Sequence, residues 1–290
     1  MKKFIAVLLT GAMTFSLAAC GSTEEKTAET ETVAADTVEA DAETAEAETT
    51  ETEDAAEQET AAAEETETEE AVAGEKSEGV MTYDEYVAAE LETEVVVETY
   101  VQAKQSWWEE DGQGKATFYT QDEDGAYFIY NMPCTQEEYD KLTQGTKIKV
   151  TGYKSEWSGE IEIIDATYEI EDGSYIAEAL DVTDKLGSDD LINYQNQFVA
   201  FKDMTVEDAG DGAAYLYNWD GSGSDGDDLY FNVSSNGQTY TFTVESYLCD
   251  ATSDVYNAVK NLKVGDTVDM EGFLYWYEGV NPHITSVTVK

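Results

Sequence analysis

The chain has 290 residues, with 64 Asp and Glu against 15 Lys, no Arg and a single His, and its formal charge is −49. Phosphate-clamping proteins normally use Arg side chains, and a histidine-based metal site needs several imidazoles, so the composition disfavours both. Two Pro and 28 Tyr and Phe also disfavour a collagen or coiled-coil rod.

The N-terminal segment is typical of a targeting signal. Lys2 and Lys3 precede an apolar run over residues 4–19 that is too short to span a bilayer comfortably and ends in small residues. Residues 17–21, LAACG, resemble the lipobox of bacterial lipoproteins. The resemblance implies cleavage before Cys20 and diacylation of its thiol, which would anchor the protein to a cell membrane, facing outside the cytoplasm. The alternative is an ordinary secretory signal with a chance cysteine.

A long acidic segment follows the signal, so we assign residues 1–19 to the signal and 20–78 to the lipidated cysteine and a tether. Residues 22–78 contain 22 acidic residues, two Lys and no aromatic residue. Such a stretch cannot bury enough apolar surface to offset the entropy of ordering, and its like charges extend it. We predict a disordered spacer; the alternative is an acidic tail that binds cations or basic partners.

The composition changes sharply near Gly79. Residues 79–290 hold 31 of the 33 aromatic residues, and their 42 acids and 11 Lys give a charge of 11 − 42 = −31. The surface of the folded part is therefore anionic in its own right. It would repel phosphate backbones unless a cation intervened, so nucleic acid is a disfavoured partner.

Alternating and β-branched runs predict mostly strands in the folded part. The first half contains a predicted helix at 83–90, strands at 94–104, 115–120 and 126–131, a helix at 135–142 with Thr135 and Glu138 as a capping box, and strands at 147–153 and 160–170. The second half contains strands at 197–207, 213–219, 228–233 and 239–247, a helix at 253–261, and strands at 267–277 and 283–289.

The same order of elements in the two halves indicates an internal repeat. At a constant offset of 120, eight pairs of equal or similar residues match: Leu142 and Leu262, Gly145 and Gly265, Ile148 and Val268, Val150 and Met270, Gly152 and Gly272, Trp157 and Tyr277, Gly159 and Gly279, and Ile164 and Ile284. We therefore predict two copies of one domain, over 79–173 and 174–290.

Each copy resembles the OB-fold, a five-stranded Greek-key barrel with a short helix between its third and fourth strands. The phrase L-x-x-G-x-x-V-x-V-x-G, followed by an aromatic residue, a Gly and a final strand, is similar to the end of bacterial OB domains. The resemblance implies a mostly β protein with two tandem OB-like barrels. Gly152 and Gly272 suit a strand bend at a barrel corner. The rival fold is a pair of small sandwiches.

The OB resemblance implies ligand binding on strands two and three and on the loops around them, where aromatic residues gather. Tyr215, Tyr217 and Trp219 would share one strand face. Such side chains can stack on sugar rings or bases, although each of them can instead fill a barrel core. The candidate ligand-binding residues are Trp107, Trp108, Tyr119, Trp157, Tyr217, Trp219, Tyr275 and Tyr277, of which the tryptophans at 107, 108 and 157 lie in predicted loops.

A loop at 208–228 is rich in Asp and Gly and is a candidate cation site. Asn218, Asp220, Ser222 and Asp225 resemble the start of an EF-hand loop, but Leu229 stands where that loop has its last carboxylate. The alternative is a solvated hairpin loop. Apart from this weak Ca²⁺ candidate, we predict no cofactor or metal.

Catalysis has little support in the sequence. His283 is the only imidazole and follows Pro282, no pair of carboxylates stands out among so many, and no nucleophile motif is present. Cys134 and Cys249 fall in different copies, which predicts free thiols. We therefore expect a protein that is not an enzyme.

The leading hypothesis is a non-catalytic, surface-anchored protein that binds an uncharged or basic ligand, such as an oligosaccharide, a peptide or a protein partner. One alternative is an OB module for single-stranded nucleic acid, which is the common role of that fold. The other alternative is a structural envelope lipoprotein, which predicts buried aromatic residues and no groove.

Overall fold

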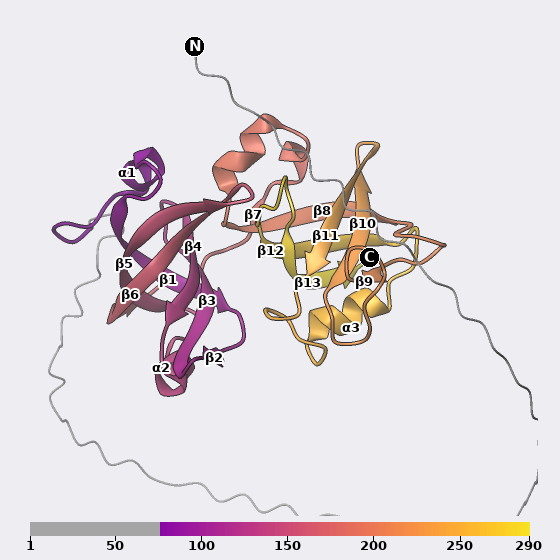
Figure 1. The fold of residues 1–290 in the computed structure, drawn as a ribbon. Coiled ribbons are helices and arrows are strands. Elements are labelled where there is room, and N and C mark those ends of the chain that lie inside the picture. The colour runs from indigo at the N-terminus through magenta and orange to yellow at the C-terminus, as the bar shows by residue number, and fades with distance from the viewer. Residues whose placement is uncertain (1–75) are drawn as a thin grey trace, which may run out of the picture. The chain divides into compact units, whose positions relative to one another are not determined.

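Two rings of β-strands follow one another along residues 76–290, the part of the chain that the computed structural model describes (Figure 1). The predicted signal, the lipidation at Cys20 and all of the tether before residue 76 lie outside the described residues. Between residues 76 and 290, no helix is long and apolar enough to cross a membrane.

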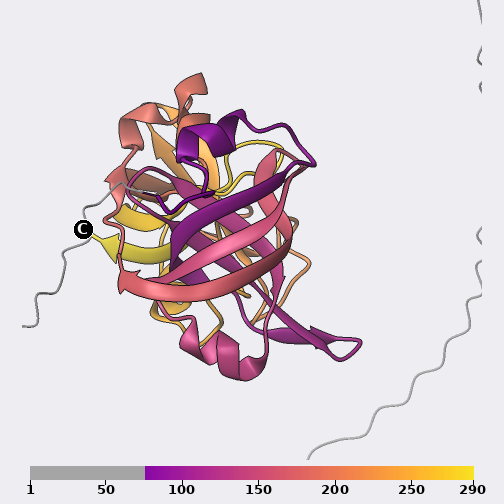
Figure 2. The same ribbon diagram turned by 90° about the vertical axis from the view of Figure 1, so that its left-hand side faces the viewer.

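The first ring closes through the pairing of its first and second long strands. Its strands follow the order β1-β5-β6-β4-β3, β3 pairs back with β1, and β4 and β6 run parallel. Figure 2 faces this ring, with β5 and β6 curving across it. The elements are α1 (Tyr83–Ala88), β1 (Glu94–Lys104), β2 (Trp108–Glu110), β3 (Gln113–Gln121), β4 (Ala126–Pro133), α2 (Gln136–Lys141), β5 (Thr146–Trp157) and β6 (Glu160–Ser174).

The second ring repeats this topology. Its strands follow the order β8-β12-β13-β11-β10, β10 pairs back with β8, and β11 and β13 run parallel. The elements are β7 (Leu180–Asp181), two 3-10 helices η1 (Thr183–Lys185) and η2 (Asp189–Tyr194), β8 (Phe198–Glu207), β9 (Leu216–Tyr217), β10 (Leu229–Ser235), β11 (Gln238–Val244), α3 (Asp254–Lys260), β12 (Thr267–Phe273) and β13 (His283–Val289).

This topology confirms the predicted fold class. In each ring the five main strands follow the sequence order one-four-five-three-two, with a helix between the third and fourth, which is the OB arrangement. Every second residue of a strand faces the inside of its ring. The repeat-related pairs Ile148 and Val268, and Val150 and Met270, accordingly sit in the two separate cores.

The helix predictions are confirmed because their caps form as expected. Thr135 and Glu138 make the predicted capping box at the start of α2. Thr82 and Glu85 form a second box at the start of α1. Lys154 then fixes the other end of α1, since its ammonium group donates to the carbonyl oxygens of Tyr86, Val87 and Ala89 at 2.8–3.0 Å.

The predicted strand at 213–219 is wrong over most of its length, because only Leu216–Tyr217 (β9) is a strand. Asn218 adopts a left-handed conformation with φ of 56°, which interrupts the alternation of side chains. Tyr215, Tyr217 and Trp219 therefore do not form one face. The short strands β2 and β7 and the 3-10 helices lack a periodic signal and were not predicted.

Gly152 and Gly272 occupy equivalent bends in β5 and β12, as predicted. A Cβ at Gly152 would lie 2.6 Å from Ile163 Cγ2 and 2.8 Å from the Ile164 carbonyl oxygen. A Cβ at Gly272 would lie 2.2 Å from the carbonyl oxygen of His283. Both glycines are therefore needed because the fourth and fifth strands of each ring approach one another too closely for a side chain.

We expect Gly152→Ala and Gly272→Ala each to lower the free energy of unfolding by about 1–3 kcal/mol, because the backbone must move to admit the methyl group. Urea unfolding of the full-length chain measures this loss. Gly112→Asn is the control, since nothing lies within 4 Å of its Cβ and Asn tolerates the left-handed φ of 80°. An equal loss in all three variants would contradict the close-approach explanation.

Candidate ligand-binding cleft

The two rings meet over a small apolar cluster. Tyr119 from β3 and Phe128 from β4 pack against Phe273 from β12, and all three are buried. The ring of Tyr119 stacks on Phe273 with centroids 4.5 Å apart and meets Phe128 edge-on at 4.9 Å. This cluster gives the rings a core of their own at the contact.

Hydrogen bonds surround this cluster and fix the orientation of the rings. The carboxylate of Glu160, at the start of β6, accepts from the Trp276 backbone N–H at 2.9 Å and from Gln195 Nε2 at 3.2 Å. On the opposite side, Gln105 Nε2 donates to Glu245 at 3.0 Å. Because these bonds are buried or half-buried, breaking one leaves an unsatisfied polar group.

Equivalent loops of the repeat also contact each other. Trp157 and Tyr277, which match at the offset of 120, lie with ring centroids 5.1 Å apart. The Glu278 N–H donates to the Ser158 carbonyl oxygen at 2.7 Å. The loops between the fourth and fifth strands of the two rings thus meet as equivalent surfaces do in a symmetric dimer.

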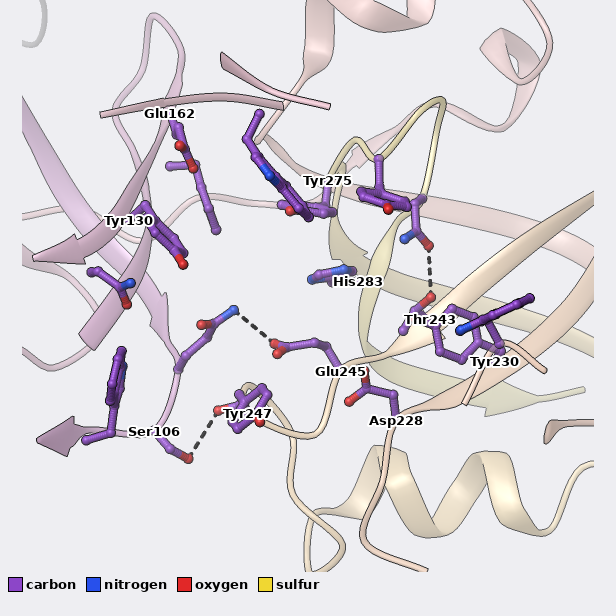
Figure 3. A pocket seen from close by; sticks show the side chains of 18 of the residues that line it. Ser106, Tyr130, Glu162, Asp228, Tyr230, Thr243, Glu245, Tyr247, Tyr275 and His283 are labelled. Carbon is purple, nitrogen blue, oxygen red and sulfur yellow. Dashed lines mark hydrogen bonds between the residues drawn. The ribbon is translucent and has the colours of Figure 1, made fainter. Parts of the chain in front are cut away.

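Beside this contact the rings enclose a cleft of about 1370 Å³ (Figure 3). Six of the eight predicted ligand-binding residues line it, and they come from both rings: Trp107, Trp108, Trp157, Trp219, Tyr275 and Tyr277. Three of the tryptophans expose much of their surface, with 75% for Trp219, 54% for Trp157 and 41% for Trp108. The tertiary structure thus gathers aromatic residues that are up to 170 positions apart in the sequence.

The other two predicted residues lie elsewhere. Tyr119 is fully buried beneath the cleft, where its hydroxyl group contacts His283 Nδ1 at 2.7 Å. Tyr217 does not line the cleft, and its hydroxyl group is within hydrogen-bond distance of Tyr215 and Asp225. Both residues therefore have structural contacts that a period-two pattern does not reveal.

The eight candidates left out the polar lining and four aromatic side chains of the cleft, which are Phe128, Tyr130, Tyr230 and Tyr247. Tyr247, which is 66% exposed, lines the cleft from the turn after β11. The carboxyl groups of Glu162 and Glu245 also line it. The sequence offered one signal for Glu162, which is the alternation along β6 that puts its side chain on the face opposite the buried Ile163. That alternation did not indicate a cleft.

The cleft is acidic and holds no lysine among its described lining residues. Its acidic groups are Glu162, Asp228, Glu245 and Glu278. Burial raises the pKa of Glu245 to about 8, with a smaller contribution from Asp228, and burial raises the pKa of Glu162 to about 6. Burial also lowers the pKa of His283 to about 3, so this imidazole stays neutral.

The candidate Ca²⁺ loop uses its side chains for other contacts. Asp225 pairs with Lys260, and Asp220 accepts from the Ser222 backbone N–H at 3.0 Å. Within residues 76–290, no group of three or more His, Cys, Asp or Glu is arranged to hold a metal ion. Asp225 and Asp220 are therefore engaged in contacts with α3 and within the loop.

Cys134 and Cys249 are free thiols, as predicted. Cys134 is buried and Cys249 is half-buried. Burial raises the pKa of Cys134 to about 11 and that of Cys249 to about 12, so both are protonated at neutral pH.

Comparison with known proteins finds likeness in structure alone. No protein-family model matches the chain, and no curated protein matches it. Similar solved structures include a murine DNA-binding protein with double-stranded DNA (10% identity, 67% of this chain and 94% of that chain, TM-score 0.33) and the Ifi202 HINa domain with 20-bp double-stranded DNA (13%, 69% and 96%, TM-score 0.30). A replication protein A heterotrimer with single-stranded DNA is also similar (11%, 68% and 49%, TM-score 0.31).

These comparisons contradict the leading hypothesis from the sequence. We expected an uncharged or basic ligand and disfavoured nucleic acid, whereas the similar structures include complexes with double-stranded and single-stranded DNA. That expectation is wrong because it considered only the phosphates of a nucleic acid, which an anionic surface repels, and left out its bases. Bases stack on aromatic faces independently of charge. At identities of 10–13% the likeness concerns the fold alone.

We expect Glu160→Gln to change how stability depends on pH. Burial raises the pKa of Glu160 from 4.5 to about 8, so the folded state binds more protons than the unfolded state between these values, and stability falls as pH rises through that window. The variant should gain on the order of 1–3 kcal/mol relative to wild type at pH 8.5 and little at pH 4.5. Urea unfolding at several pH values measures the difference. A difference that is the same at every pH would contradict this assignment, and Glu278→Gln, an exposed carboxylate, is the control.

Proposed function

We propose that the cleft binds single-stranded nucleic acid through its bases. The observation that supports this proposal is the gathering of six predicted aromatic residues from two barrels around one open cleft. Stacking on aromatic side chains is the sequence-tolerant way in which proteins bind single strands, because every base has a π-face. A paired duplex does not offer its base faces, so a single strand fits this cleft better.

The size of the cleft supports an oligomeric ligand. Its volume of about 1370 Å³ exceeds the ~300–1,000 Å³ that is usual for a pocket holding one small molecule. Trp108 and Trp157 belong to the first ring, whereas Trp219 and Tyr277 belong to the second. A strand of several nucleotides can therefore place successive bases against both barrels.

The charge of the cleft specifies which part of the ligand enters. Four carboxyl groups line it, and Lys115, which lies 4.1 Å from the ring centroid of the cleft-lining Trp108, already pairs with Glu110. Phosphates would meet repulsion inside, so we propose that they remain outside while the bases enter. Carboxylate and amide groups can then accept or donate hydrogen bonds at base edges.

We propose binding without a chemical reaction. The only imidazole, His283, is 6% exposed, is held neutral by burial and contacts the Tyr119 hydroxyl group. Both described thiols are protonated at neutral pH, so neither offers a thiolate nucleophile. These observations favour a binding role over catalysis.

We expect Trp157→Ala and Trp108→Ala each to weaken binding of a fluorescent single-stranded oligonucleotide about tenfold, because one stacked base is worth ~1–3 kcal/mol. Fluorescence anisotropy with the full-length chain measures the affinity. Tyr153→Ala is the control, since Tyr153 is 42% exposed but does not line the cleft.

The dependence of affinity on salt concentration distinguishes binding through the bases from binding through the phosphates. Raising the salt concentration should strengthen binding or leave it unchanged, because it screens the repulsion between the anionic surface and the phosphates. Binding that weakens steeply with salt, or that prefers duplex DNA, would contradict the proposal.

We also propose that the protein is lipid-anchored outside the cytoplasm. The LAACG motif at 17–21 supports this location, and the acidic stretch that follows provides a spacer between membrane and barrels. A single-stranded ligand would then be met in the cell envelope or beyond it.

We expect Cys20→Ala to abolish incorporation of radiolabelled palmitate when the full-length gene is expressed in a bacterial host, because the thiol is the acylated group. The protein should move from the membrane to the soluble fraction or retain its signal. Cys249→Ala is the matched control. Unchanged labelling of the Cys20 variant would overturn the lipoprotein assignment.

A further inference from the structure

Two carboxylates on β6 have opposite surroundings although they share one face of the strand. Glu160 and Glu162 are two residues apart and therefore point to the same side, away from the Ile163 side chain in the core of the first ring. Glu160 accepts hydrogen bonds from the second ring. The carboxyl group of Glu162 receives no hydrogen bond or ion pair from any group in residues 76–290, although the residue is only 7% exposed.

Glu162 faces the cleft. Figure 3 shows it with Tyr130 on the side of the first ring, facing Tyr275, Glu245 and His283 of the second. The oxygens of Glu162 are not among the fully buried, unpartnered side-chain atoms of the described residues, so they border the open cleft although the residue as a whole is covered. Here the position that a donor would occupy lies in the open cleft, where a ligand can reach it.

Glu162 differs in this respect from the polar groups around it. Glu245 already accepts from Gln105, and Asp228 accepts from the backbone and hydroxyl groups of Ser246. The Asn281 side-chain oxygen accepts from Thr243. Glu162 is therefore the cleft carboxylate that is both buried and left with its hydrogen-bonding capacity unused by the described residues.

We propose that Glu162 is a specificity-determining residue, which accepts a hydrogen bond from the exocyclic amino group of a base and so favours cytosine and adenine over thymine and uracil. This inference rests on the proposed nucleic-acid function of the cleft. Carboxylates accept from the N4 amino group of cytosine. Thymine has a carbonyl oxygen at the equivalent position, and its one N–H lies between two carbonyl oxygens that repel a carboxylate.

Cytosine and thymine give the sharpest comparison because they are pyrimidines of similar size and stack similarly. With the full-length wild-type chain, we expect oligo(dC) to bind about tenfold more tightly than oligo(dT) of equal length, as measured by anisotropy. In Glu162→Gln, the side-chain amide can donate to the thymine carbonyl, so the ratio should fall to about one. Thermal unfolding of the variant establishes that it is folded.

Glu156→Gln is the matched control, because it removes the same charge from an exposed residue next to Trp157 that does not itself line the cleft. Relief of general electrostatic repulsion would strengthen the binding of both oligonucleotides equally in both variants. It would leave the ratio of dC affinity to dT affinity unchanged in the control. A ratio that falls in Glu162→Gln alone supports the inference.

The outcomes distinguish failure of this inference from failure of the proposed function. Tight binding of both oligonucleotides with a ratio near one in wild type, or an unchanged ratio in Glu162→Gln, would overturn the role of Glu162 and leave the stacking function standing. Binding of neither oligonucleotide would overturn the proposed function and this inference together.

Discussion

The docking of the two barrels is the constraint on which the candidate site depends. Neither barrel contains the cleft by itself, because its walls come from loops and strands of both. The stacked pair of Tyr119 and Phe273 supplies the apolar contact, and Glu160 adds buried hydrogen bonds that a misaligned interface would leave unmade. Precise docking therefore places aromatic side chains of separate barrels within reach of one ligand.

The repeat explains how such an interface can arise from one domain. Trp157, the last residue of β5, and Tyr277, in the loop after β12, match in the repeat and contact each other across the interface, so the two copies meet through related surfaces. The copies differ where they serve the cleft. β9 has two residues, and the left-handed Asn218 ends its alternation shortly before Trp219, which lines the cleft.

Burial reduces the charge inside the cleft of this strongly acidic protein. The high net negative charge disfavours a phosphate-binding surface, yet it leaves base stacking open, since stacking depends on π-faces and excluded water. Inside the cleft, burial raises the pKa values of Glu162 and Glu245 and keeps His283 neutral. The interior of the cleft is thus less charged than its composition implies, and hydrogen bonding there is correspondingly selective.

The sequence by itself determined the main strands and helices and the OB-like topology, because strand alternation, capping boxes and turn glycines are encoded by neighbouring residues. Of the three tryptophans predicted in loops, only Trp107 lies in one, because Trp108 begins β2 and Trp157 ends β5. Only the tertiary structure decided that these residues meet in one cleft, that Tyr119 is buried beneath it and that Glu162 faces it without a donor. Those facts depend on contacts between residues more than a hundred positions apart, and no local pattern records how two barrels dock.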